Sequence, residues 1–390
     1  MNRLEKILLS IQLKISSINV KTLSDIGKLT KKVKKTNPKD VNAIQNIYLE
    51  TEVKANKAID RINKYTNYIV KKSKNIFNSI ARREYLKTKA FYMFRGKNFV
   101  DFKDHVKTQN IINNSYNAFT RDILNLSNTT GFKLLDRNKK VVHVPIKQAY
   151  RNVINQAVLQ VQNGTLTYNE AIRNVLKQYA DSGIRYVQYE SGYSKRLDSA
   201  VRQNIIDTVK QIKQEIHLEL GKEYEADGVE INTHMNCAPD HLPVQGHQFS
   251  NEEFSKMQSN MSCKDIKGNS YEAFKRQIGQ WNCRHLAFPI IIGVTAPNKT
   301  DEELEKIKKK NNEVKVINGE EYTGYEATQE QRKMELKIRQ SRERLKIFEE
   351  TDDQIAINEA KKEVSRQIKV YKDFSQKANL SVKMENTKII

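Results

Sequence analysis

Histidine and cysteine side chains gather in one stretch of this 390-residue chain and could bind a metal ion. Residues 228–297 contain all three cysteines, four of the seven histidines and the single tryptophan. Imidazole and thiolate are preferred zinc ligands, and four of them make a closed tetrahedral site. The spacing suggests one such set: His234, Cys237, Cys283 and His285, with His241 as an alternative ligand.

The same spacing leaves a simpler interpretation open. Only one residue separates Cys283 from His285, which is unusual for zinc ligands, and no two cysteines are separated by two residues. Buried thiols and histidines often pack, or bond to the backbone, without binding a metal. We therefore expect no cofactor, and zinc is the alternative that the ligand types keep open.

A nuclease site can also be built from these residue types. Asp240, His241 and His285, together with Asn282, resemble an HNH-like set around a magnesium or zinc ion. However, the helix that normally carries the last histidine is replaced here by an apolar stretch containing Pro289. This departure argues against the nuclease, because function must be argued from the geometry of a site.

A cysteine nucleophile fits the residue types as well. Either Cys237 or Cys283 could be activated by a nearby histidine. Any cysteine and histidine in one stretch would give the same pattern, so it is not specific. We expect that the chain is not an enzyme, and a metal-dependent nuclease or hydrolase remains the alternative.

A structural interpretation accounts for more of the residues. The indole of Trp281 is a large group to bury, and Asn282 can form backbone-like hydrogen bonds in a turn. The guanidinium of Arg284 suits a buried carboxylate. The candidate partners of Arg284 are Asp227, Glu230 and Asp240. In this interpretation the segments around residues 234–247 and 279–289 pack together around a small mixed core.

The positive charge of the chain is concentrated in its first part. The formal net charge is +22, and residues 1–150 hold 31 Lys and Arg against 11 Asp and Glu, whereas residues 151–390 hold 37 against 35. A solvated helix surface would explain the excess, but so would a polyanionic partner, and lysine suits nonspecific attraction to phosphate. The candidate DNA-facing residues are Lys54, Lys57, Lys64, Lys71, Lys72 and Lys74.

Apolar residues at steps of three and four predict helices over most of residues 1–125, one of which begins after Asp40. Residues 131–145 predict a hairpin with a turn at Asp136–Asn138. Helices follow up to residue 222, interrupted by a short strand at residues 184–189. Near the end, a charged helix contains a predicted surface pair four residues apart, Glu335 with Arg339.

The stretch that contains the histidines and cysteines differs in kind, because it holds four of the six prolines and only short apolar runs such as GVEINTH and AFPIIIGV. The sequence therefore predicts an α+β protein, mainly α. We expect four consecutive segments. They are a basic helical region (1–125), a helical region with a hairpin (126–227), a mixed core with His, Cys and Trp (228–300), and charged C-terminal helices (301–390).

Cysteine usage and hydropathy bear on the compartment. An odd number of cysteines argues for reduced thiols and synthesis in a cytoplasm. The longest apolar run after the N-terminal residues is about eight residues around Phe288–Val294, too short for a membrane span of about 20 residues. We expect no membrane span.

Several motifs in a fixed order resemble those of the phage minor capsid protein 2 family, which is similar to the Mu F-like group of minor head proteins. They are SGYSKRLDSAVRQNI (191–205), EADGVEINTHMNCAPDHLPVQGHQFSNEEF (225–254), IGQWNCRHLAFPIIIGV (278–294) and YEATQEQRKMELKIR (325–339). The resemblance covers residues 130–385. The matching signature positions are His234, Pro239, His241, Gln245, Gly246, Trp281, Asn282, Cys283, Arg284 and His285.

One position departs from the family pattern. A cysteine at position 237 is not expected in every relative, which weakens a zinc site built on Cys237. The alternative set of ligands is then His234, His241, Cys283 and His285.

The resemblance implies a structural component of the virion, present in few copies and associated with the portal vertex. Its implied partners are the portal protein, other capsid components and packaged double-stranded DNA, which the basic N-terminal part would contact. In some relatives this role extends to entering the host with the genome. The implied location is the virion, with the host cytoplasm during assembly. A nonspecific DNA-binding protein without a role in the capsid is a second alternative.

Overall fold

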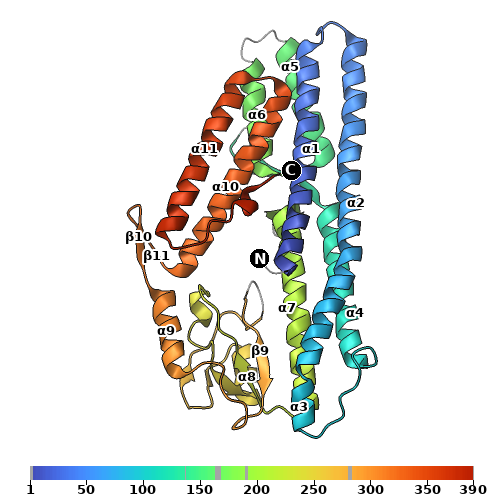
Figure 1. Ribbon diagram of the computed structural model, residues 1–390. Helices are drawn as coiled ribbons and strands as arrows, with labels where there is room; N and C mark the ends of the chain where they lie inside the picture. Colours follow the sequence, from blue (N-terminus) through green and yellow to red (C-terminus); the bar gives the residue numbers. More distant parts are fainter. Residues whose placement is uncertain (1–2, 137, 163–167, 189–191, 280–282, 390) are drawn as a thin grey trace. The chain divides into compact units, whose positions relative to one another are not determined.

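The computed structural model describes residues 3–136, 138–162, 168–188, 192–279 and 283–389. In these residues helices dominate and the strands are short, so the predicted α+β, mainly α class is confirmed (Figure 1). Unit 1 comprises Met1–Ile69, Asp122–Gln203 and Gln331–Ile390, and unit 2 comprises Val70–Arg121 and Asn204–Glu330. Each unit joins distant segments of the chain, and the division into four consecutive segments stays a prediction.

Unit 1 is built mainly of helices. They are α1 (Arg3–Lys35), the first part of α2 (Val41–Lys87), the end of α4 (Val106–Asn128), α5 (Ile146–Gln162), α6 (Tyr168–Ser182), the start of α7 (Leu197–Glu223), most of α10 (Gly324–Thr351), α11 (Gln354–Lys377) and the 3-10 turn η2 (Met384–Thr387). The predicted start of a helix after Asp40 is confirmed. The Asp40 carboxylate caps α2 by accepting a hydrogen bond from the N–H of Ala43 at 2.9 Å.

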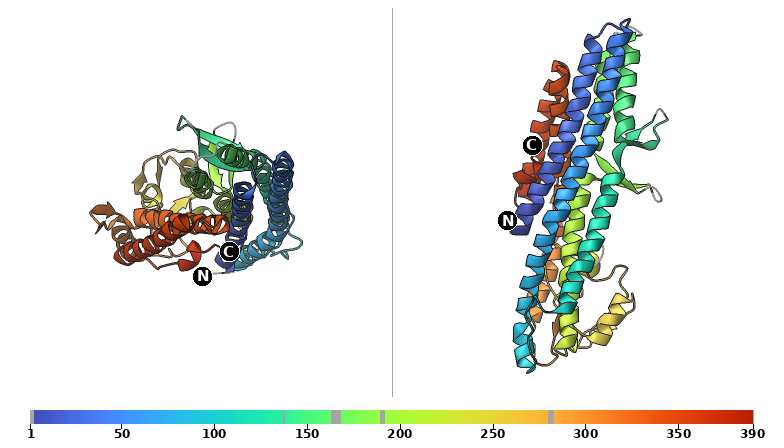
Figure 2. Two further views of the ribbon diagram at one scale, coloured as in Figure 1. Left: turned by 90° about the horizontal axis from the view of Figure 1, so that it is seen from above. Right: turned by 90° about the vertical axis from the view of Figure 1, so that its right-hand side faces the viewer.

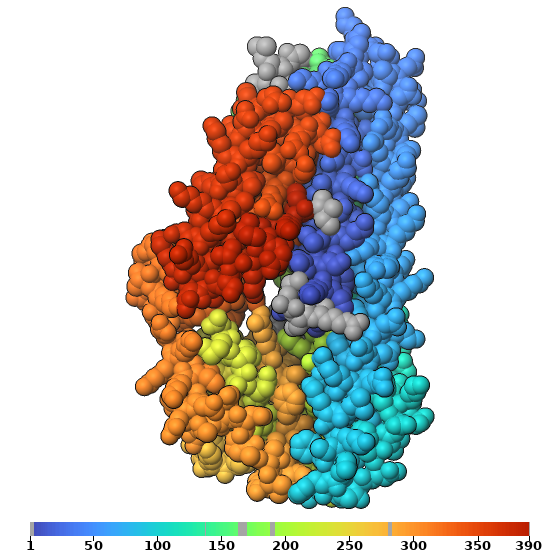
Figure 3. All heavy atoms as spheres, in the orientation of Figure 1, coloured from blue at the N-terminus to red at the C-terminus, as the bar shows by residue number. Residues whose placement is uncertain are grey.

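Helix α1 has a neighbour on each side within unit 1. Its Asp25 accepts hydrogen bonds from Lys54 and Arg61 of α2, and the two ribbons lie side by side in both views of Figure 2. Gly27 lets α10 approach, since a Cβ there would lie 3.2 Å from the carbonyl oxygen of Ile347. Accordingly, the red and orange atoms of α10 and α11 adjoin the blue atoms of α1 (Figure 3).

The predicted hairpin is present in unit 1. Strands β1 (Thr130–Leu135) and β2 (Val141–Pro145) pair in antiparallel register, and the carboxylate of Asp136 accepts hydrogen bonds from the N–H groups of Asn138 and Lys140. Strands β3 (Arg185–Gln188) and β4 (Tyr193–Arg196) extend this sheet in the order β2-β1-β3-β4.

A buried ion-pair network in unit 1 replaces the expected surface pair of Glu335 and Arg339. Arg339 pairs with Asp198, and Arg196 donates to Glu343 at 2.7 and 2.9 Å. All four of these charged side chains are buried. Glu335, also buried, accepts instead from Tyr371 and Asn386. The predicted pairing is therefore wrong, because neighbouring segments cover this side of α10 and supply closer partners.

Unit 2 combines helices with small sheets. Its remaining helical elements are α3 (Lys89–Phe94), α8 (Asn251–Gln258), α9 (Asp301–Asn312) and the 3-10 turn η1 (Pro239–His241). The rings of Phe77 in α2 and Phe119 in α4 meet edge to face at 5.1 Å. The buried carboxylate of Glu84 joins α2 to α7, since Lys213 Nζ and His217 Nε2 lie 3.3 and 3.4 Å from it.

The two strands predicted around the histidines and cysteines are neighbours in the three-stranded main sheet of unit 2. Strand β5 (Gly228–Ile231) pairs with β9 (Ala287–Ile290) on one side and with β6 (Gln248–Ser250) on the other, all antiparallel. Two minor hairpins complete the unit, β7 (Cys263–Lys264) with β8 (Ser270–Tyr271), and β10 (Lys315–Ile317) with β11 (Glu320–Tyr322). Val229, Phe249 and Met257 are among the buried residues of the core behind the main sheet.

Helix α7 holds β9 in place within unit 2. The amide of Gln214 donates to the carbonyl of Ala287 at 3.1 Å and accepts from its N–H at 2.9 Å, so it satisfies both backbone groups. In the described residues, no helix carries an apolar stretch long enough to cross a lipid bilayer.

The buried ion pairs predict a large loss of stability for Glu343→Ala. Removing this carboxylate leaves Arg196 without its main buried partner, which should cost about 3–5 kcal/mol. The matched control is Glu349→Ala on the same helix, whose exposed pair with Lys346 is worth about 0–1 kcal/mol. Thermal and urea unfolding of both variants measure the difference, and equal losses would contradict the importance of the network.

Candidate metal centre

The pairing of β5 with β9 brings the two histidine- and cysteine-containing segments together. Just beyond the end of β5, the N–H of Asn232 donates to the carbonyl of Leu286 at 3.1 Å, and the Asn232 side chain accepts from the N–H of Leu286 at 2.6 Å. Because this ladder continues past the strand, His234 and the turn η1 lie beside the residues that precede β9.

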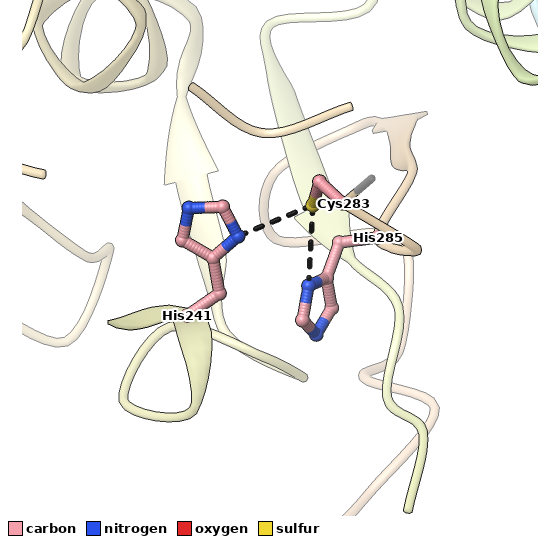
Figure 4. Close-up of side chains that lie close together, drawn as sticks. All are labelled: His241, Cys283 and His285. Carbon is pink, nitrogen blue, oxygen red and sulfur yellow. Dashed lines mark hydrogen bonds between the residues drawn. The ribbon is translucent and has the colours of Figure 1, made fainter. Parts of the chain in front are cut away.

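Three ligand atoms converge on one point in this region. The Nδ1 atom of His241 lies 3.1 Å from the Sγ atom of Cys283, and the Nδ1 atom of His285 lies 3.5 Å from the same sulfur. Figure 4 shows both rings directing one nitrogen toward the sulfur. The potential ligand atoms of all three residues lie within 4.8 Å of one another, and the three residues are at most 2% exposed.

The far nitrogens of both rings are held by oxygen atoms. The Nε2 atom of His241 lies 2.6 Å from the carbonyl oxygen of Arg276, and the Nε2 atom of His285 lies 3.3 Å from Oε1 of Gln245. An oxygen acceptor requires a proton on each Nε2, which leaves each Nδ1 with a lone pair facing the sulfur. This is the outer arrangement that orients metal-binding histidines.

The structure separates the two ligand sets considered above. The ring of His234 stacks on that of His285 at 4.3 Å between centroids, and its Nε2 is buried without a hydrogen-bond partner among the described residues. Cys237 lies outside the three-residue group, and its N–H donates to Asn311. The alternative ligand His241, rather than Cys237, therefore joins Cys283 and His285.

Comparison with known proteins decides the family. The profile of the phage minor capsid protein 2 family matches residues 19–375, nearly the whole chain. The chain belongs to this family. It therefore has a structural role in the phage particle. No curated protein and no solved structure matches the chain.

Of the other positions predicted from the sequence to match the family pattern, His234, Pro239, Gln245, Gly246 and Arg284 lie in the described residues. Pro239 begins η1, and Gln245 accepts from the N–H of His234 at 3.1 Å while facing His285. Gly246 has a φ of +80°. Trp281 and Asn282 lie outside the described residues.

The position of Arg284 contradicts the prediction that it pairs with a buried carboxylate. It is exposed, and the three carboxylates suggested as its buried partners bond elsewhere: Asp240 to Arg276, Glu230 to Gln248 and Asn298, and Asp227 to the N–H of Ile292. The expected burial is wrong because alternate residues face opposite ways beside the strand, so that Cys283 and His285 point inward and Arg284 outward.

Sequence reasoning missed three contacts that support the cluster. Asn232 extends the strand pairing, Arg276 supplies a carbonyl to His241, and Lys210 of α7 donates to the carbonyl of Cys283 at 2.5 Å. All three contacts use backbone groups of the histidine- and cysteine-containing segment, and residue types carry no signal for a backbone contact.

Cys283 and His241 shift the pKa of each other. Burial alone would raise the pKa of the Cys283 thiol, but the hydrogen bond with His241 lowers it overall. Burial alone would lower the pKa of His241, but the bond and charge of Cys283 raise it overall. Burial, followed by the charges of His234 and His241, lowers the pKa of His285 to about 3. A thiolate and a neutral imidazole are the forms that bind metals.

The geometry favours binding over catalysis. The sulfur of Cys283 is buried and faces the rings of His241 and His285. Asp240, the carboxylate of the nuclease hypothesis, forms two hydrogen bonds with Arg276 at 3.0 and 2.8 Å. Cys283 and Asp240 are therefore both engaged by other described residues, although Asp240 is exposed.

The candidate DNA-facing lysines are placed along α2. Lys54 is half-buried and lies 3.3 Å from Asp25 and 3.7 Å from Glu50, so its charge is compensated. Lys72 is half-buried and has interactions of its own. The other four candidates are exposed: Lys57, Lys64, Lys71 and Lys74.

Gly246 provides a test of how tightly the signature loop is packed. A Cβ at this position would overlap Leu304 and approach Thr233, and a residue other than glycine is strained at its positive φ. Gly268→Ala is the control, because Gly268 has a φ of +88° but nothing within 4 Å of its Cβ position. We expect the control to cost about 1–2 kcal/mol and Gly246→Ala to cost about 1–3 kcal/mol more. Equal midpoints of thermal unfolding would contradict the packing.

Proposed function

We propose that this minor capsid protein is a low-copy component of the portal vertex that contacts the packaged DNA and acts in head assembly and genome ejection. Family membership supports the place in the phage particle and contact with other capsid components. The observation that carries the DNA contact is a helical face of unit 2 without carboxylates.

This face is formed by α2 and α4. Residues 70–83 of α2 and 106–121 of α4 contain no Asp or Glu. The two segments pack against each other, since Lys74 Nζ lies 5.5 Å from the ring centroid of Tyr116. Lys71, Lys74 and Arg82 are exposed, and their spacing of three and eight residues places them on one side of α2.

The chemistry of the face suits a phosphate backbone. Lys97 lies outside the two segments and is compensated by a glutamate at 2.6 Å, and Lys107, at the start of the α4 segment, is compensated by another at 2.7 Å. The face retains the positive charge of the exposed Lys71, Lys74 and Arg82, which attracts a polyanion. An open groove continues it, lined by Asn78, Ser79, Arg82, Arg83, Leu86, Lys87 and Phe102. Of these, Arg83 and Lys87 lie 3.5 and 2.8 Å from the carboxylate of Glu84. Lysine and asparagine side chains contact phosphates without reading base sequence.

Replacing Lys71, Lys74 and Arg82 together by Gln should weaken duplex DNA binding by the full chain. Each lost phosphate contact lowers the slope of log affinity against log salt by about 0.9, so the triple variant should lower it by up to about 2.7. Fluorescence anisotropy with labelled duplexes of two unrelated sequences, measured over a salt series, gives the slope and shows whether binding depends on sequence.

The matched control replaces three exposed lysines of α9 by Gln. These residues, Lys306, Lys309 and Lys310, belong to the same unit but lie in a segment with Asp301, Glu302 and Glu303. We expect the control to keep the slope of the unmodified chain. A control that binds as weakly as the α2 variant would show that net charge, not the acid-free face, attracts the DNA.

Association with the portal vertex predicts that the full chain co-purifies with the portal protein of the same phage when the two are co-expressed. The same experiment with the major capsid protein in place of the portal protein is the control for nonspecific capture. Absence of the portal protein after affinity purification would contradict the proposed location. DNA binding without portal association would favour the alternative of a nonspecific DNA-binding protein.

A further inference from the structure

The side chains of His241, Cys283 and His285 do not carry enough protons to satisfy one another's hydrogen-bonding atoms. Both Nε2 atoms donate to oxygens, so both Nδ1 atoms present lone pairs to the sulfur. A neutral thiol carries one proton and can satisfy only one of the two nitrogens. The other nitrogen would face a sulfur atom across 3.1 or 3.5 Å with no proton between them. Buried polar atoms rarely remain in that state.

Additional protons on the imidazole rings do not satisfy both nitrogens and the sulfur without burying uncompensated charge. An imidazolium at His241 paired with a thiolate still leaves the lone pair of His285 facing a negative sulfur. Protonating both rings would bury two positive charges beside one negative charge, in residues that are at most 2% exposed. Uncompensated charge in such a place is costly. A divalent cation would satisfy both nitrogens and the thiolate together.

We propose that His241 Nδ1, Cys283 Sγ and His285 Nδ1 bind a structural zinc ion, with His234 Nε2 as the fourth ligand. Zinc binds imidazole nitrogen at about 2.0–2.1 Å and thiolate sulfur at about 2.3 Å, so tetrahedral geometry separates nitrogen from sulfur by about 3.6 Å. The observed separation is 3.5 Å for His285, close to this value, and 3.1 Å for His241, about 0.5 Å shorter. Two imidazoles and a thiolate suit zinc better than magnesium or calcium, which prefer oxygen ligands.

His234 qualifies as the fourth ligand on a separate observation. Its Nδ1 lies 3.3 Å from the carbonyl oxygen of Met235, which accounts for the proton on that nitrogen. Its Nε2 is buried and has no hydrogen-bond partner among the described residues, while its ring stacks on that of His285. The nitrogen that lacks a partner therefore belongs to a ring beside the cluster. His234 lies outside the group whose ligand atoms are within 4.8 Å of one another, so its Nε2 would have to approach the other ligands when the ion binds.

The position of the cluster defines what the ion would do. His234 and His241 follow β5, whereas Cys283 and His285 precede β9, and 41 residues lie between His241 and Cys283. A bond across this separation closes a long loop, which contains β6, α8, β7 and β8. The zinc would hold the adjoining ends of β5 and β9 together and contribute to the stability of unit 2. This inference holds whether or not the chain binds DNA or the portal.

The test begins with the unmodified full chain, purified without added metal or chelator. Elemental analysis should find about one zinc per chain. Removing the ion with a chelator should lower the midpoint of thermal unfolding, and adding zinc should restore it. Cobalt in place of zinc should give the strong visible absorption of a tetrahedral site and a thiolate charge-transfer band. Absence of stoichiometric metal, together with a midpoint insensitive to zinc, would overturn the proposal.

Variants assign the ligands. Cys283→Ser and His241→Ala should lose the zinc, whereas Cys263→Ser should retain it, because Cys263 is equally buried but lies outside the cluster. If the first two variants do not fold, Gln245→Ala is the informative one, since removing a group that orients a ligand weakens metal affinity by about 10–100-fold. Wild-type affinity in Gln245→Ala, or loss of zinc in Cys263→Ser, would contradict the assignment.

Discussion

The antiparallel pairing of β5 with β9 is the constraint on which the rest of unit 2 depends. The register sets Ile231 opposite Ala287, and the bonds between Asn232 and Leu286 carry the pairing one residue further. Side chains alternate along such a ladder, so Cys283 and His285 face the same way and meet His241 from η1. One backbone ladder therefore brings together His241, Cys283 and His285, which lie far apart in this stretch of the sequence.

In each unit, some basic residues are paired with carboxylates that lie far away in the sequence, and the net charge of the chain does not show this pairing. In unit 1, Lys28 and Lys31 of α1 lie beside Glu350 and Asp352, which follow them by more than 300 residues. In unit 2, Glu219, Glu223 and Glu225 compensate Lys97 and Lys107. Four lysines of the N-terminal part are thus paired with carboxylates of the C-terminal half. The acid-free face of α2 and α4 is distinctive because no carboxylate of its own segments offsets it.

The sequence predicted what depends on local periodicity and failed where distant segments meet. The helices, the hairpin closed by Asp136 and the strands β5 and β9 follow from spacing and turn residues. The pairing of Glu335 with Arg339 failed because Asp198, more than 130 residues away, is the closer partner of Arg339. The predicted pairing of Arg284 with a buried carboxylate was wrong, because the burial of a side chain depends on which face of the ladder it occupies. The residue types of the cluster were predictable from the sequence. That His241 rather than Cys237 lies beside Cys283 and His285 could not be predicted, because it depends on the position of the turn η1.

The proposed role of His234, His241, Cys283 and His285 in this capsid protein is structural: they would bind an ion that links β5 to β9. X-ray absorption at the zinc edge on the full chain in solution tests it most directly, since it reports the type and distance of each ligand. The expected spectrum has one sulfur at about 2.3 Å and three nitrogens at about 2.0–2.1 Å. A shell without sulfur, or a chain without zinc, would contradict the claim.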